Sequence, residues 1–125
     1  METEESVVRE FVRAFNDGEI DAFARTLDPK VELESMKGVR RGIAEARKWA
    51  TRSPGGVQQT VVIESLKALD ETVLLLIRRD WHWAEDEGFA GSDEMAWLFR
   101  LSGGLVRLWR PFDDREQAEE VFQGS

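Results

Sequence analysis

Residues 99–122 read FRLSGGLVRLWRPFDDREQAEEVF, and this stretch decides the fold. Apolar and polar residues alternate on both sides of the Ser-Gly-Gly at 102–104, which predicts two strands joined by a tight hairpin turn. Asp113 and Glu116 then have the spacing of a capping box, which predicts a short final helix that reaches Phe122. The chain is therefore expected to end in a β-hairpin followed by a helix.

The hairpin belongs to a longer run of predicted strands. Alternation with a period of two residues predicts strands at 57–66, 72–83, 94–101 and 105–112. The acidic, glycine-rich stretch 84–93 is predicted to be a loop. The four strands are expected to form an antiparallel meander.

The first half of the chain is predicted to be mostly helical. Apolar residues recur at helical spacing near the N-terminus, and Gly18 follows them as a left-handed cap. The pair Asp28-Pro29 is expected to end the second helix. We expect a helix, a short helix, a short strand, a loop and a third helix, in the order 4–16, 21–27, 31–34, 38–42 and 43–50.

Composition predicts one folded domain over residues 1–125. Hydrophobic residues make up 42% of the chain and charged residues 34%, which is typical of a globular protein. The formal net charge of −8 argues against nucleic acid or an anionic membrane as a partner, because phosphate binding needs a basic surface. The chain has no cysteine and a single histidine, so neither a metal nor another cofactor is expected.

The N-terminal sequence METEESVVRE is acidic and lacks the basic start and apolar run of a signal peptide. The longest apolar run, 73–77, is too short to span a bilayer. These two observations predict a cytoplasmic protein.

Three segments carry a resemblance to a known family: EFVRAFNDGEIDAFARTLDPKVELES at 10–35, GIAEARKWA at 42–50, and the C-terminal stretch 99–122. In their order and spacing they resemble the nuclear transport factor 2-like (SnoaL-like) superfamily. The resemblance implies an α+β cone, in which a curved mixed or antiparallel β-sheet wraps around N-terminal helices. This fold hosts isomerases, hydrolases, cyclases and non-enzymatic binders, so activity has to be argued from the site.

Ketosteroid isomerases of this superfamily need a carboxylate base beside a phenol and a neutral carboxylic acid. The resemblance places these three groups at Leu33, Phe11 and Trp97, and none of these residues carries the required group. We therefore exclude that activity.

Limonene epoxide hydrolases give a closer comparison. Their Arg-x-Asp strand motif is similar to the spacing of Arg78 and Asp80, so the resemblance implies that Asp80 donates a proton to an opening epoxide while Arg78 orients the carboxylates. The carboxylate that activates water falls on Pro111, as does the aspartate of SnoaL-type polyketide cyclases. A replacement base would have to come from Asp113 or Glu34.

Arg78, Asp80 and His82 alternate along the predicted strand 72–83, so their side chains share one face of the sheet at spacings of ~6.5–7 Å. We expect this face to point into the cone, where the three residues form a candidate catalytic cluster with His82 as an acid. The alternative is a structural ion pair between Arg78 and Asp80 at the mouth of the cone, with His82 in solvent.

The opposite face of the same strand carries Ile77, Trp81 and Trp83, which would make a large apolar patch if exposed. We expect a homodimer that buries this outer face.

Aromatic and apolar residues elsewhere are expected to line the interior of the cone. A ligand pocket and a closed core are equally compatible with them, and Trp97 in particular is a candidate to plug the space that substrate occupies in relatives. These candidate ligand-binding residues are Phe11, Phe15, Leu33, Trp49, Met95, Trp97, Phe99 and Trp109.

Two functions remain open from the sequence. The first is a cone protein that binds a small apolar molecule and carries out acid-assisted epoxide hydrolysis or isomerisation. The second is a non-catalytic dimeric interaction module with a filled core. A cavity that reaches Asp80 would separate the two.

Overall fold

The computed structural model describes residues 4–35, 38–50, 57–83 and 89–124; side chains are described for all of these except 35, 49–50, 57–59, 82–83 and 89–90. In this part of the chain there are four helices: α1 (Glu4–Asp17), α2 (Ile20–Arg25), α3 (Ile43–Ala50) and α4 (Arg115–Gln123). The six strands are β1 (Leu27–Ser35), β2 (Gly38–Arg41), β3 (Val57–Leu69), β4 (Thr72–Trp83), β5 (Phe89–Ser102) and β6 (Leu105–Phe112).

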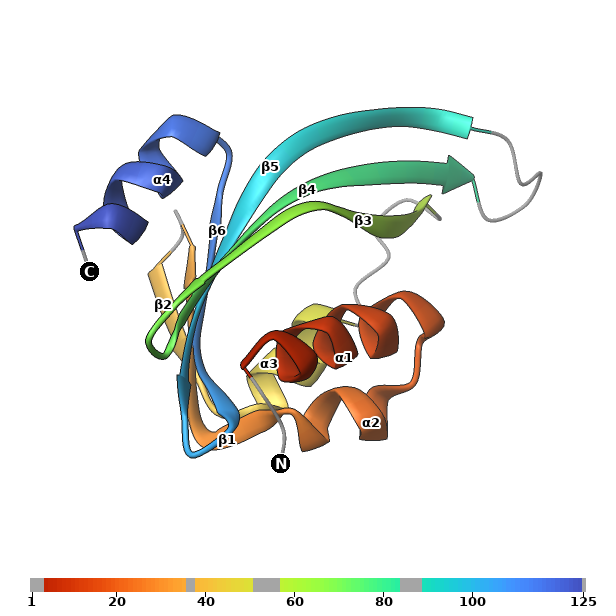
Figure 1. The fold of residues 1–125 in the computed structure, drawn as a ribbon. Helices are drawn as coiled ribbons and strands as arrows, with labels where there is room; N and C mark the ends of the chain where they lie inside the picture. The colour runs from red at the N-terminus through yellow and green to blue at the C-terminus, as the bar shows by residue number, and fades with distance from the viewer. Residues whose placement is uncertain (1–3, 36–37, 51–56, 84–88, 125) are drawn as a thin grey trace.

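The six strands form one curved, unclosed sheet in the order β2-β1-β6-β5-β4-β3. The pair β1–β6 is parallel and the other pairs are antiparallel. Helices α1, α2 and α3 lie against the concave side of the sheet, and α4 lies on the opposite side (Figure 1). The predicted α+β cone is confirmed.

Each side of the sheet has its own apolar cluster. The larger one, here called the concave cluster, joins the buried stripe of α1 to the inward side chains of the strands. The smaller one, here called the α4 cluster, packs Ala118 and Phe122 of α4 against Leu74, Leu98 and Phe112. A sheet covered on both sides needs strands that are apolar on both faces, which accounts for the near-continuous apolar run of β4.

The rotation of β4 is set by these two clusters. Leu75 and Ile77 belong to the concave cluster, whereas Leu74 and Leu76 belong to the α4 cluster. The register shifts of its two pairings place the extra residue in β3 and in β5, so β4 itself alternates without interruption. Odd-numbered residues of β4 therefore face the helices and even-numbered residues face the side of α4.

Asn16 fastens the end of α1 to the edge of the sheet. Its side-chain Nδ2 donates to the backbone oxygen of Val61, and the Val61 amide donates to its Oδ1, both at 2.8 Å. Since β3 is an edge strand, Val61 has backbone groups that no strand neighbour pairs on that side. The amide of Asn16 takes the place of a strand neighbour and fixes the distance between α1 and β3.

Helices at 4–16 and 43–50 and strands at 72–83 and 105–112 are confirmed to within one residue. The loop predicted at 38–42 is wrong, because residues 38–41 form β2 and pair with the outer edge of β1. The loop predicted up to residue 93 is also wrong in its second half, because β5 already begins at Phe89 and pairs with β4.

Two smaller boundaries differ as well. Asp28-Pro29 does not end a helix, since α2 stops at Arg25 and the pair lies in β1, where the pairing with β6 is interrupted between Leu27 and Glu32. Proline has no N–H to donate and fits such an interruption. The last helix is capped by Asp114 rather than Asp113, because the Asp114 carboxylate accepts from the backbone N–H of Glu116 at 2.9 Å.

Among the described residues, no helix is long and apolar enough to cross a membrane.

Candidate functional site

The predicted catalytic pair Arg78 and Asp80 is formed, but on the side of the sheet opposite to the one predicted. Nε of Arg78 donates to Oδ1 of Asp80 at 2.9 Å and Nη2 donates to Oδ2 at 3.3 Å. The hydrogen bond to Asp80 raises the pKa of the Arg78 guanidinium, and the nearby charges of Glu64 and Glu94 add to this effect. Both residues have even numbers on β4 and therefore lie on the side of α4. The prediction that this face points into the cone was wrong.

The surroundings of this pair are polar and belong to the docking of α4. Arg115 at the start of α4 donates to the backbone oxygen of Ile77 at 2.7 Å and to that of Met95 at 3.3 Å, and it pairs with Glu64. Arg78 and Asp80 thus border a network that holds the last helix on the sheet. This arrangement is closer to the structural ion pair that the sequence left open than to an acid within a hollow.

His82 lies in β4 opposite Gln58 of β3 and Phe89 of β5. Its side chain lies outside the described residues, as does that of Trp49 in α3. The role of His82 as an acid and the role of Trp49 as a ligand contact therefore stay predictions.

The aromatic residues predicted to lie inside the cone do so. Phe11 of α1 is fully buried, with ring centroids at 4.7 Å from Trp109, 4.8 Å from Phe23 and 5.0 Å from Phe99. The centroids of Trp97 and Trp109 are 5.0 Å apart. Every predicted interior residue whose side chain is described belongs to the concave cluster: Phe11, Phe15, Leu33, Met95, Trp97, Phe99 and Trp109. At these spacings the rings contact one another, so this part of the interior is filled by side chains.

A second Arg–Asp pair lies on the concave side, where the aromatic cluster ends. Nε and Nη2 of Arg79 donate to the two carboxylate oxygens of Asp93 at 2.9 and 2.6 Å. The guanidinium carbon of Arg79 also lies 4.9 Å from the ring centroid of Trp81. The Arg79 side chain is 20% exposed, and that of Asp93 is 45% exposed. These three residues, here called the concave polar group, combine a charged pair, an aromatic face and partial access to solvent.

The sequence prediction missed Arg79 and Asp93. Asp93 fell within the predicted loop, and Arg79 was assigned to the outer face. The one signal that points to the observed rotation is the final amphipathic helix, because it needs an apolar strand face of its own and Leu74 and Leu76 supply it.

The outer sheet surface predicted for a homodimer is wrong at Ile77. Ile77 has no exposed surface and packs in the concave cluster beneath the helices. Trp81 lies on the same concave side and is half-buried, and the side chain of Trp83 lies outside the described residues.

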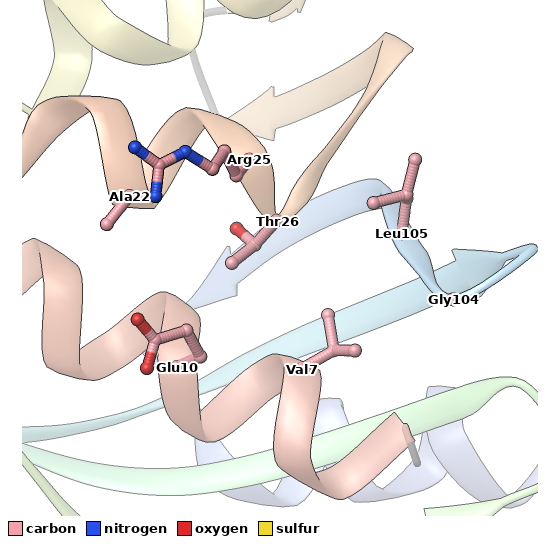
Figure 2. A pocket seen from close by; sticks show the side chains of 7 residues that line it. All are labelled: Val7, Glu10, Ala22, Arg25, Thr26, Gly104 and Leu105. Atoms are coloured by element: carbon pink, nitrogen blue, oxygen red, sulfur yellow. The ribbon is translucent and has the colours of Figure 1, made fainter. Parts of the chain in front are cut away.

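An open cleft of about 380 Å³ lies elsewhere, between α1, α2 and the turn that joins β5 to β6 (Figure 2). Val7 and Leu105 line its end near the turn, and Glu10 and Arg25 project into its other end from facing helices. None of the residues predicted as site residues from the sequence lines it. Across the described residues, no group of three or more His, Cys, Asp or Glu side chains is arranged to hold a metal ion.

Comparison with known proteins agrees with this architecture. The family model of the SnoaL-like domain matches residues 8–109, so the chain belongs to the SnoaL-like family. No curated protein matches the sequence significantly.

Solved structures with low identity share the fold. A putative polyketide cyclase from Xanthomonas campestris pv. campestris is 18% identical, with a TM-score of 0.76 over 98% of this chain and 96% of that chain. An epoxide hydrolase of M. tuberculosis that is LEH-like is 20% identical, with a TM-score of 0.70 over 94% and 85%. A ketosteroid isomerase-like hypothetical protein from Catenulispora acidiphila, in complex with trimethylamine, is 15% identical, with a TM-score of 0.72 over 85% and 83%.

Proposed function

We propose that this protein binds a small apolar, ring-containing molecule on the concave side of the sheet, at the end where the aromatic cluster meets the concave polar group. The observation that supports it is the change in burial along β4. Leu75 and Ile77 are completely buried, and the next residues on the same side, Arg79 and Trp81, are partly open. Small-molecule sites combine an apolar wall with a few oriented polar groups in this way.

The concave polar group is suited to orient such a ligand. Asp93 holds two of the N–H groups of Arg79, and Trp81 lies against the guanidinium, so the side chain is fixed before any ligand arrives. The guanidinium has five N–H groups in all, and within the described residues its Nη1 edge makes no hydrogen bond. A fixed donor costs less conformational entropy on binding than a mobile one.

In acid-assisted epoxide opening or isomerisation at this site, the proton would come from Asp93. Asp80 lies on the other side of the sheet, and Asp93 is the carboxylate that β4 and β5 present to the concave side in the region described. The fold relatives include an LEH-like epoxide hydrolase and a putative polyketide cyclase. Replacing Asp93 with asparagine would remove the acid and keep the side-chain size.

Binding is tested by equilibrium dialysis with 2-naphthol, together with NMR of the methyl groups. We expect Trp81→Ala to weaken binding about tenfold, because an aromatic contact contributes about 0.5–1.5 kcal/mol beyond its buried area. Arg78→Ala, on the other side of the same strand, is the matched control and should leave the affinity unchanged. Shifts at the methyls of Ile77 and Met95, without shifts at Leu74, would place the ligand on the concave side.

A second function is supported by a different observation. The filled aromatic cluster around Phe11 is what a non-catalytic interaction module with a closed core requires. In that case 2-naphthol at 1 mM would leave the methyls of Ile77 and Met95 unshifted, and the binding function proposed above would be overturned.

A further inference from the structure

The cleft between α1, α2 and the β5–β6 turn has two chemically different ends (Figure 2). Val7 and Leu105 form an apolar end beside Gly104, which has no side chain to close it. Glu10 of α1 and Arg25 of α2 line the other end, on two helices that face each other. A molecule that fits this cleft therefore has an apolar body and a polar head.

The charge of the polar head depends on which of the two charged side chains, Glu10 or Arg25, already has a partner of opposite charge. Nε of Arg13 donates to Oε2 of Glu10 at 2.8 Å, and Nη2 of Arg13 donates to Oε1. These bonds lower the pKa of the Glu10 carboxyl, and Glu10 shares Arg13 with Asp17 and Glu19. Arg25 makes no ion pair and no hydrogen bond within the described part of the chain. Arg25 is therefore the charged group of the cleft that is left to bind a head group of opposite charge.

An unpaired arginine is unusual in this chain, which has a net charge of −8. Among the described arginines, Arg25 and Arg100 have neither a salt bridge nor a hydrogen bond, whereas the others are bound to carboxylates or, for Arg107, to a backbone oxygen. Arg100 is exposed on β5 and does not line the cleft. It is therefore a natural control for the contribution of a free guanidinium alone.

We propose that this cleft binds a small monocarboxylate with an apolar chain, whose carboxylate pairs with Arg25 and whose chain lies over Val7 and Leu105. The planar guanidinium of arginine matches a carboxylate in a two-bond fork, which a neutral amide cannot reproduce. The buried Thr26 between the two ends has its hydroxyl committed to the backbone oxygen of Phe23 at 2.7 Å. The carboxylate is thus recognised by Arg25 and the chain by apolar contact.

The test uses hexanoate, hexanamide and hexylammonium with the full chain, followed by methyl NMR. Hexanoate should bind in about the millimolar range that so small a ligand allows, and it should shift the methyls of Val7, Ala22 and Leu105. Hexanamide should bind at least tenfold more weakly. Arg25→Gln should weaken hexanoate at least tenfold, and Arg100→Gln should leave its affinity unchanged.

A second variant tests the apolar end independently. Leu105→Ala should weaken hexanoate several-fold and leave the much weaker binding of acetate unchanged, because acetate has no chain to reach that residue. The inference is overturned if hexanamide or hexylammonium binds as well as hexanoate, if Arg100→Gln has the effect of Arg25→Gln, or if the methyls of the cleft do not shift. Because the cleft and the concave polar group have no residue in common, either can fail without the other.

Discussion

Two adjacent arginines of strand β4 each form an ion pair with an aspartate, and the two pairs lie on opposite sides of the sheet. Arg78 with Asp80 and Arg79 with Asp93 both use Nε and Nη2 to hold a carboxylate. The first arginine is 42% exposed and the second 20% exposed, and only the second stacks on an aromatic ring. The same kind of ion pair therefore lies in two different surroundings, because neighbouring residues of a strand point to opposite faces of the sheet.

The comparison teaches where to look for function in a strand that is apolar on both faces. The pair on the side of α4 borders the network through which Arg115 holds that helix on the sheet. The pair on the concave side follows a sealed aromatic cluster and reaches partial solvent access. The ion pair in the first setting lies beside the contacts that hold α4, and the one in the second setting is the pair that we propose to meet a ligand.

The largest expected effect tests the rotation of β4 itself. Leu75→Ala should lower the free energy of unfolding by about 2–5 kcal/mol, because Leu75 is fully buried in the concave cluster. Leu76→Ala should cost less, about 1 kcal/mol, because Leu76 is only half-buried beside α4. Urea unfolding followed by circular dichroism measures both. Equal losses, or a larger loss for Leu76, would contradict the rotation.

The next effect compares the two arginines directly. Arg79→Ala removes two hydrogen bonds to a carboxylate and a cation–π contact from a mostly buried position, so it should cost about 1–2 kcal/mol of stability. Arg78→Ala, which removes a guanidinium that is 42% exposed and that stacks on no ring in the described part of the chain, should produce a loss close to the measurement error. The same urea experiment measures both variants, and a larger loss for Arg78 would contradict the difference in burial and in aromatic contact between the two arginines.

Much of the fold was predictable because its signals are local. The stripe of Val7, Val8, Phe11, Val12 and Phe15 identifies α1, and all five residues are buried, together with Ala14. The hairpin turn after β5 is equally local: Gly103 and Gly104 both have positive φ, as the tight turn requires.

The candidate site could not be predicted from the sequence because its position depends on tertiary packing. Both faces of β4 are apolar, so periodicity alone leaves its rotation open, and the choice depends on where α4 packs. Asp93 was hidden for a related reason. Its neighbourhood has the composition of a loop, and it becomes part of β5 because β4 extends far enough to pair with it opposite Arg79.

The smallest expected effect is the change that added salt makes to the coupling free energy of each ion pair. A double-mutant cycle on Arg79 and Asp93, with alanine at both positions, gives their coupling free energy independently of the other contacts of each residue. Raising ionic strength from 0.05 to 1 M should reduce this coupling by only a few tenths of a kcal/mol, because solvent reaches little of the arginine and short hydrogen bonds remain when mobile ions screen the charges. The cycle on Arg78 and Asp80 should lose more of its coupling, since 42% of its arginine is open to ions and, in the described part of the chain, no aromatic ring lies against that guanidinium. If the Arg79–Asp93 coupling vanished in high salt instead, the guanidinium would be mobile in solution, and Trp81 and Asp93 would no longer explain how the concave side could present a fixed donor to a ligand.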